Sequence, residues 1–176
     1  MGALSERLHD RLQWQPAGSI FDGPRRYLMM RPDVLMGAVV GLDPLARLNW
    51  LQAWSASTAR HGDASLKAYA EHHPDDPQGL CDTVVQAAAD LGWGRWHCHR
   101  HSDRIVLHVE DSPFAAGWHA AASEACAHAV CAPIQGMFSA LARRLMPGAV
   151  EVEECRCGAQ TQEASICRFE ARRGVM

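Results

Sequence analysis

The chain has 176 residues, the size of one ordinary domain, and it is long enough to bury a sizeable core. Its formal net charge of -3 comes from interspersed acidic and basic residues, and no basic stripe typical of nucleic-acid binding proteins is present. The longest apolar runs, such as Val34 to Leu42, are too short to span a bilayer. We therefore expect neither a nucleic-acid partner nor a membrane partner.

Composition also bears on the compartment and on the chemistry. The chain contains seven cysteines and ten histidines, which indicate metal or cofactor chemistry unless they reflect biased codon usage. Residues 1–7 lack the basic start and the apolar stretch of a secretory signal. An odd number of cysteines without such a signal favours reduced thiols over a disulfide framework. We therefore expect a cytoplasmic protein.

Helices dominate the first half of the chain. Leu4, Leu8 and Leu12 recur every four residues, which predicts a short amphipathic helix that ends at Pro16. Residues 19–21 and 25–30 flank Asp22-Gly23-Pro24 and predict a β-hairpin. Proline and aspartate then mark the starts of four further helices, at Pro32, at Asp43-Pro44, at Asp63 and at Asp76-Pro77.

Strands and an Ala-rich helix make up the second half. Residues 95–101 and 104–110 alternate in polarity and predict a second hairpin. A long helix begins at Ser112-Pro113 and is interrupted or restarted at Pro133. A strand from residue 150 and the segment 166–171 predict a last hairpin. Helices and antiparallel hairpins without a βαβ pattern predict a single α+β domain over residues 1–176, with three hairpins in one antiparallel sheet backed by helices.

The densest chemical segment lies near the C-terminus, where residues 151–157 contain three glutamates and two cysteines and Cys167 follows. Thiolates and a carboxylate form a tetrahedral donor set for zinc, because sulfur favours zinc over harder ions. Cys155 and Cys157 would share one face of a regular strand. The Cys-x-Cys spacing alone leaves open whether these residues bind a metal or are small buried thiols beside an acidic strand.

Histidines cluster in two places. His97, His99 and His101 alternate, so a strand would project all three from one face. Imidazoles about 7 Å apart along a strand are too widely spaced for one ion unless the strand bends, which favours a solvent-facing edge strand. His128 and Cys131 lie three residues apart and would share a face of the predicted helix. His128 is therefore a candidate to support or replace Cys131 in a metal site.

Four stretches that cover nearly the whole chain carry a resemblance to a known family. They are residues 25–31, residues 46–64, residues 92–115 with Glu110-Asp111-Ser112-Pro113-Phe114-Ala115, and residues 150–169 with Glu154-x-x-Cys157, and they occur in the same order as in that family. Together they resemble the vinyl-4-reductase domain family, which also forms the sensory domains of bacterial phenol- and xylene-responsive regulators. The resemblance implies a ligand-binding fold of the NO-signalling and Golgi-transport type. It also implies a homodimer, for which the apolar helix faces at 33–42, 44–59 and 133–146 are candidates.

The resemblance further implies a zinc site. In the sensory domains of this family, the zinc ligands are a helix cysteine, a Glu-x-x-Cys pair and a final cysteine. The matching positions in this sequence are Cys131, Glu154, Cys157 and Cys167. Cys155 precedes an arginine, as the family's cysteine often does, and is the alternative to Cys157. The loop before Cys167 is longer than is usual in the family. A zinc with four protein ligands would be structural, because no position is left for water.

For function, the resemblance implies a binding protein rather than a catalyst, with a pocket for a hydrophobic or aromatic small molecule. The candidate pocket residues are Trp54, Trp96, Trp118, His119, His128 and Phe138. No nucleophile–base set, ATPase segment or helix-turn-helix segment is recognisable, so we expect the chain to act alone or with a partner chain. The chain departs from the family at Ala132, where a tryptophan is usual, and at Gly136-Met137, where a Gly-Tyr pair is usual.

Two other functions stay open at this point. The first is a carrier or accessory protein for a tetrapyrrole, haem or a chlorophyll precursor, since the family name refers to vinyl reduction and histidines ligate haem iron. A reductase is harder to support, because Gly92-Trp93-Gly94 precedes a strand and does not form a dinucleotide fingerprint. The second is an assembly protein, which exposure of Trp14, Trp50 or Trp118 would support.

Overall fold

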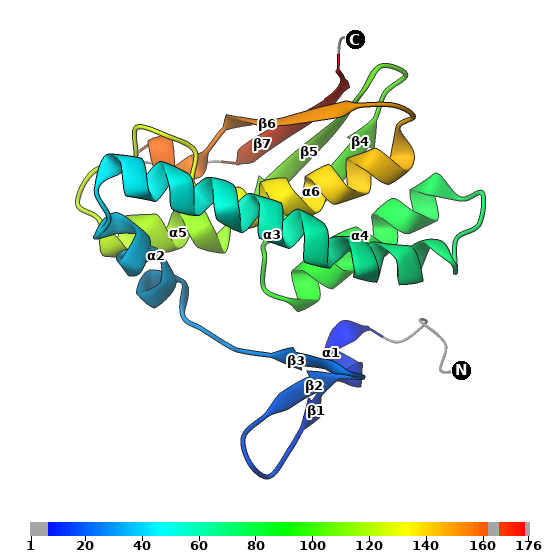
Figure 1. Cartoon of the computed structure of the whole chain (residues 1–176), viewed down its shortest axis with the longest axis horizontal. Coiled ribbons are helices and arrows are strands. Elements are labelled where there is room, and N and C mark those ends of the chain that lie inside the picture. The colour runs from blue at the N-terminus through cyan, green and yellow to red at the C-terminus, as the bar shows by residue number, and fades with distance from the viewer. Residues whose placement is uncertain (1–6, 162–165, 175–176) are drawn as a thin grey trace.

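The computed structural model describes residues 7–161 and 166–174 and has the α+β class predicted from the sequence (Figure 1). Its helices are α1 (Leu8–Arg11), α2 (Pro32–Val40), α3 (Pro44–Ala70), α4 (Pro77–Asp90), α5 (Pro113–Ala121) and α6 (Ala132–Leu145). Its strands are β1 (Gln13–Trp14), β2 (Ile20–Asp22), β3 (Arg25–Tyr27), β4 (Arg95–Arg100), β5 (Arg104–Glu110), β6 (Val150–Arg156) and β7 (Cys167–Arg173), with a 3-10 turn η1 (Gly158–Gln160) between β6 and β7.

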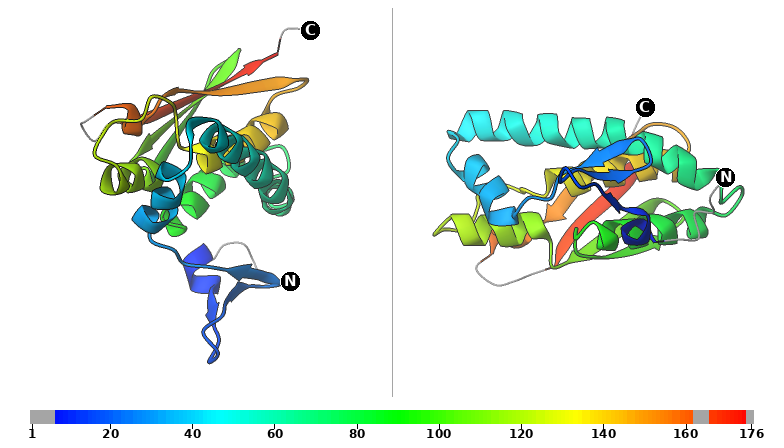
Figure 2. Two further views of the ribbon diagram at one scale, coloured as in Figure 1. Left: turned by 60° about the vertical axis from the view of Figure 1, so that its left-hand side comes forward. Right: turned by 90° about the horizontal axis from the view of Figure 1, so that it is seen from below.

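The strands form two antiparallel sheets. The predicted central and C-terminal hairpins pair in a four-stranded sheet of order β4-β5-β7-β6. The predicted N-terminal hairpin forms a separate sheet of order β1-β2-β3, so the prediction of one sheet was wrong. The N-terminal strands have only two or three residues each, and Ile20 alone among these strand residues is buried, so adding them to the main sheet would bury little apolar surface. With α1 they stand apart from the rest of the molecule (Figures 1 and 2).

Capping residues explain where most helices begin. Asp43 accepts hydrogen bonds from the backbone N–H groups of Leu45 and Ala46, at 3.0 and 2.9 Å, and starts α3 as expected. Asp63, however, does not start a new helix. Its carboxylate instead pairs with Arg144 of α6, with a shortest distance of 2.7 Å. Helix α3 runs through this position and has 27 residues in all. The N-terminal helix spans only Leu8–Arg11, and Leu4 lies outside the described residues.

The predicted Ala-rich helix is two helices separated by a loop. Helix α5 ends at Ala121, and residues 122–131 are not helical. The loop is anchored from both sides, because the Trp118 indole donates to the Glu124 carbonyl (3.0 Å) and the Cys126 N–H donates to the Ala159 carbonyl (2.7 Å). Pro133 then lies in the first turn of α6, where its missing N–H is harmless. His128 and Cys131 therefore do not share a helix face.

The main core lies between the four-stranded sheet and the helices, which cover one face of that sheet (Figure 2). Helix α6 is its centre: Phe138 is fully buried and meets Phe169 of β7 edge to face, with ring centroids 6.4 Å apart. Helix α3 packs across α6, and Gly136 permits their close approach, since an added Cβ there would lie 2.2 Å from the Ser55 carbonyl oxygen. Among the described residues, no helix has the length and apolar character needed to cross a membrane.

Candidate metal centre

A bulge in β6 decides which C-terminal side chains face inward. The pairing of β6 with β7 shifts in register between Glu154 and Arg156, so Cys155 lies at an irregularity in the strand. On a regular strand, Glu154 and Cys157 would point to opposite faces, because they are three residues apart. A bulge inserts an extra residue and reverses the alternation beyond it. Glu154 and Cys157 are consequently both buried, whereas Cys155 is exposed.

Four donor side chains meet at this bulge. Cys131 comes from the start of α6 and Cys167 from the start of β7, and their sulfurs are 3.6 Å apart. The Cys131 sulfur lies 3.7 Å from that of Cys157, and the ligand atoms of Cys131, Glu154, Cys157 and Cys167 are all within 4.8 Å of one another. The structure therefore brings together the four residues to which the resemblance pointed.

The sulfur separations fit a common metal ion. They are far longer than a disulfide bond of about 2.05 Å, and all seven cysteines, each in a described part of the chain, are free thiols. Three sulfurs placed tetrahedrally at about 2.3 Å from a zinc ion would be about 3.8 Å from one another. The observed 3.6 and 3.7 Å are close to that value. The cluster could thus hold a metal ion with little rearrangement.

The buried acidic groups of the cluster also favour a bound cation. Glu154 is only 9% exposed, and one of its carboxylate oxygens accepts the Cys131 N–H at 3.1 Å. The other oxygen, Oε1, is buried and has no hydrogen-bond partner among the described residues. Burial, followed by the neighbouring Cys157, raises the pKa of Glu154 to about 9. A carboxylate and thiolates cannot all ionise in one dry site unless a cation compensates their charge, and the unpartnered oxygen offers it a ligand.

Surrounding groups fix the donors in place. The Gly158 N–H donates to the Cys167 sulfur at 3.2 Å, and the Ser112 hydroxyl lies 3.2 Å from the Cys131 sulfur. The contacts with Cys131 and Cys157, together with the Gly158 N–H, lower the pKa of Cys167 to about 4. Such outer hydrogen bonds orient metal ligands and tune their basicity. Ser112 and Gly158 were not singled out as site residues from the sequence, because only the fold brings them to the cysteines.

The remaining metal candidates lie outside the cluster. Cys155 is exposed, and its sulfur lies 3.8 Å from the Glu153 carbonyl oxygen. This corrects the prediction that Cys155 could take the place of Cys157. His128 is exposed on the loop before α6 and is not part of the cluster, so the helix face that it was expected to share with Cys131 does not form. Both errors arose from assuming regular secondary structure where the chain has a bulge and a loop.

A separate aromatic cavity of about 370 Å³ lies between the N-terminal sheet and the helical layer. Trp54 of α3 and Trp93, which follows α4, each meet Phe114 of α5 edge to face, with centroid distances of 5.4 and 5.7 Å. The other walls come from the described segment before α2 (residues 7–31), here called the arm, and from the ends of helices. They include Leu12, Trp14, Ile20, Tyr27, Leu28, Met29, Met30, Pro32, Leu35 and Asp90. Trp93 and Phe114 belong to the family-like stretches, but the sequence did not mark them as pocket residues.

Other predicted pocket residues have different places. Trp96 is buried beside Trp93 and donates its indole N–H to the Trp93 carbonyl at 3.0 Å. Trp118 is buried in the core with the Arg47 guanidinium 5.1 Å from its ring centroid, and Phe138 is also a core residue. Only Trp54 of the predicted set lines the aromatic cavity.

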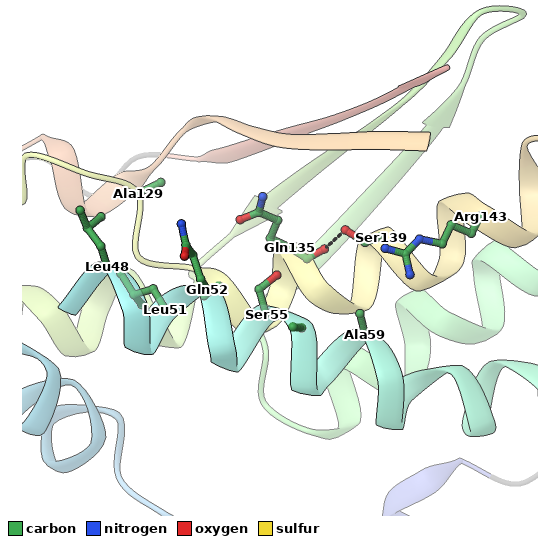
Figure 3. A pocket seen from close by; sticks show the side chains of 11 residues that line it. Leu48, Leu51, Gln52, Ser55, Ala59, Ala129, Gln135, Ser139 and Arg143 are labelled. Atoms are coloured by element: carbon green, nitrogen blue, oxygen red, sulfur yellow. Dashed lines mark hydrogen bonds between the residues drawn. The ribbon is translucent and has the colours of Figure 1, made fainter. Parts of the chain in front are cut away.

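His119 borders a smaller space near the metal cluster. Its Nε2 lies 3.0 Å from the Gly158 carbonyl oxygen, and it lines a cavity of about 320 Å³ with Ser112 and Ala115. A third cavity, of about 390 Å³, lies between α3 and α6 (Figure 3). Its walls include Gln135 and Ser139, which share a 2.7 Å hydrogen bond, and no aromatic residue lines it. Of these three cavities, the one around Trp54 is best suited to an aromatic ligand.

Comparisons with known proteins support the fold. No protein-family model matches the chain, and no curated protein matches it. Among solved structures, it is similar to the phenol-responsive sensory domain of the transcription activator PoxR, determined with phenol. The TM-score is 0.77 at 16% sequence identity, and the match covers 94% of this chain and 86% of the sensory domain. At that identity the likeness establishes a shared fold, which is the fold that the resemblance to such sensory domains implied.

Proposed function

We propose that the chain is a small-molecule binding domain for an apolar or aromatic ligand, with a C-terminal hairpin fixed by a structural metal. The observation that carries this proposal is the cavity walled by Trp54, Trp93 and Phe114. Its volume of about 370 Å³ is within the range of small-ligand pockets, and mainly apolar walls with few polar groups are typical of such sites. The PoxR sensory domain of similar fold was determined with phenol, a small aromatic molecule, which supports the same class of ligand.

Polar groups at the cavity restrict the ligand further. Asp90 accepts the Leu8 N–H at 2.8 Å and a side-chain N–H of Gln86 at 2.9 Å, so its carboxylate is already engaged. Burial, followed by Asp22, raises the pKa of Tyr27, which leaves its hydroxyl neutral and able to donate a hydrogen bond. The best fit is a single-ring compound with one polar substituent.

We propose zinc as the metal, held by Cys131, Glu154, Cys157 and Cys167. Thiolates favour zinc over harder ions, and four protein ligands leave no position for a reactive water. The ion would tie the start of α6 to the β6–β7 hairpin and so hold three elements together. The alternative tetrapyrrole role has less support, because no histidine among the described residues lines the aromatic cavity.

A homodimer is also proposed. Val34, Leu45 and Trp50 of α2 and α3 are large apolar side chains with more than half of their surface exposed. Helix α6, the third predicted dimer face, instead buries its apolar residues against the sheet and α3. The exposed Trp14 and Trp50 would also suit an assembly protein, whereas Trp118 is buried.

The ligand-binding proposal is tested by titrating the full chain with phenol and with toluene in a calorimeter. We expect micromolar to millimolar binding of at least one compound, and a loss of about tenfold or more in Trp93→Ala, because each lost aromatic contact contributes about 1 kcal/mol or more. Trp50→Ala is the matched control, since Trp50 is exposed and is not among the residues that line the cavity. Absence of binding, or equal binding by both variants with unchanged melting temperatures, would overturn the proposal.

A further inference from the structure

The outer face of the main sheet carries three histidines on two neighbouring strands. In the β4–β5 pairing, His97 lies directly opposite His108, and His99 lies opposite Val106. Because side chains alternate along a strand, His97, His99 and His108 project from the same face, together with Glu110. The opposite face holds Trp96, Leu107 and Val109 in the core. The imidazoles are therefore on the side of the sheet that the helices leave uncovered.

The third histidine changes the geometry expected from β4 alone. His97 and His99 are about 7 Å apart along their strand, a distance that one ion does not easily bridge. His108 sits across from them: its ring centroid is 5.7 Å from that of His99, and the Cβ atoms of direct cross-strand partners such as His97 and His108 are about 4.5–5.5 Å apart. The three rings thus form a compact triangle in place of an extended row.

We propose that His97, His99 and His108 form a second metal site, for a divalent transition metal such as zinc, nickel or copper. Imidazole suits these ions, and three nitrogens at about 2.0–2.1 Å leave a fourth position open on the solvent side. The ring nitrogens do not meet at one point in the structure, so binding requires side-chain rotation. His97 has 43% of its side chain exposed, and exposed side chains change rotamer within nanoseconds.

The charges around the triangle are compatible with a cation. The Glu110 carboxylate lies 3.3 Å from the Nε2 atom of His97, an arrangement that orients a metal-binding imidazole. Arg95 is close by but already pairs with Glu110 at 2.9 Å. Arg168 of β7 lies opposite His108, and its guanidinium pairs with Glu170. Arg95 and Arg168 thus each have a carboxylate partner, and Arg172 shares the Glu170 carboxylate with Arg168.

This site is independent of the cysteine cluster, because it uses other strands and another class of ligand atom. The two sites can be separated with cobalt(II), which gives intense sulfur-to-metal charge-transfer absorption with thiolates but not with imidazoles. We expect the full chain at pH 7.5 to bind two equivalents of zinc in native mass spectrometry. The second equivalent should be lost in the double variant His99→Ala, His108→Ala, while the thiolate absorption with cobalt is retained.

Two further variants complete the test. His101→Ala is the matched control: His101 follows β4 and pairs with Arg104 through its backbone, with no histidine opposite, so both equivalents should remain. Cys131→Ser should lose the thiolate absorption but keep the histidine-bound ion. Glu110→Gln should weaken the second site about 10- to 100-fold, as changes around metal ligands commonly do. The proposal would be overturned if the unaltered chain bound a single equivalent of zinc, or if the double variant kept the second equivalent. It would also be overturned if His101→Ala lost the second equivalent as the double variant does.

Discussion

Glu154 destabilises the metal-free protein but is expected to contribute to metal binding. Its Oε1 atom is buried without a partner in the described structure, so the metal-free protein bears the desolvation of that oxygen. We expect Glu154→Gln to weaken zinc binding, because the negatively charged carboxylate ligand becomes a neutral amide. In the presence of a chelator, the same change should leave the free energy of unfolding unchanged or raise it by about 1 kcal/mol. Chelator competition and melting curves with and without chelator measure both effects, and parallel losses of stability in the two states would contradict the expected sign.

Cys155 and Cys157 provide a second residue-scale test, because they are neighbours in sequence but not in environment. Cys157→Ser removes a sulfur of the cluster and should abolish the thiolate-to-cobalt absorption. It should also lower the free energy of unfolding of the zinc-loaded protein by about 2 kcal/mol or more, which for this chain length is roughly 4–8 °C in melting temperature. Cys155→Ser should change neither quantity, since Cys155 is exposed. Equal effects of the two substitutions would show that the bulge does not select between them.

At the scale of elements, the contact between α3 and α6 depends on one glycine. An added Cβ at Gly136 would lie 2.2 Å from the Ser55 carbonyl oxygen, so the backbones must separate to accept it. We expect Gly136→Ala to lower the free energy of unfolding by about 1–3 kcal/mol, as overpacking in a core does. Urea unfolding measures the difference.

Gly37 in α2 is the matched control for Gly136. It is also a helical glycine, but an added Cβ would meet only the Cβ of Ala121, at 3.9 Å. Gly37→Ala should therefore raise the free energy of unfolding by about 0.5–1 kcal/mol through helix propensity alone. If both substitutions change the free energy of unfolding in the same direction, close helix packing does not determine the effect of Gly136→Ala.

The sequence predicted those elements whose signals are local. Asp43 and Asp76 mark helix starts that the structure confirms, and alternation found the β4–β5 and β6–β7 hairpins. Asp63 was misassigned, because a cap and a side chain that pairs with a distant arginine have the same sequence signal. The bulge at Cys155 has no local signal either, since it arises from pairing with β7. The resemblance supplied the choice of Cys131, Glu154, Cys157 and Cys167, which spacing alone left open.

The aromatic cavity could not be read from the sequence because it belongs to the molecule as a whole. Its walls come from the arm that includes Tyr27, from α3, from the turn after α4 and from α5, and apolar periodicity does not distinguish a filled core from a hollow one. The arm is held to the main body near the cavity by Arg7 and by the Leu8 N–H, which both bond to Asp90 of α4. Ligand binding and docking of the arm therefore involve the same surface.

The exposed apolar side chains of α2 and α3 lead to the last prediction, on the oligomeric state. Leu45 is 68% exposed and Trp50 is 51% exposed, an arrangement that subunit contact would stabilise by removing apolar surface from water. We expect light scattering at micromolar concentration to give the mass of a dimer, and the double variant Leu45→Glu, Trp50→Glu to give that of a monomer with unchanged helix content. Trp14→Glu is the matched control, because Trp14 is 65% exposed but lies on the arm. A monomeric mass for the unaltered chain would exclude the dimer. Dissociation by Trp14→Glu alone would move the interface from the helices to the arm.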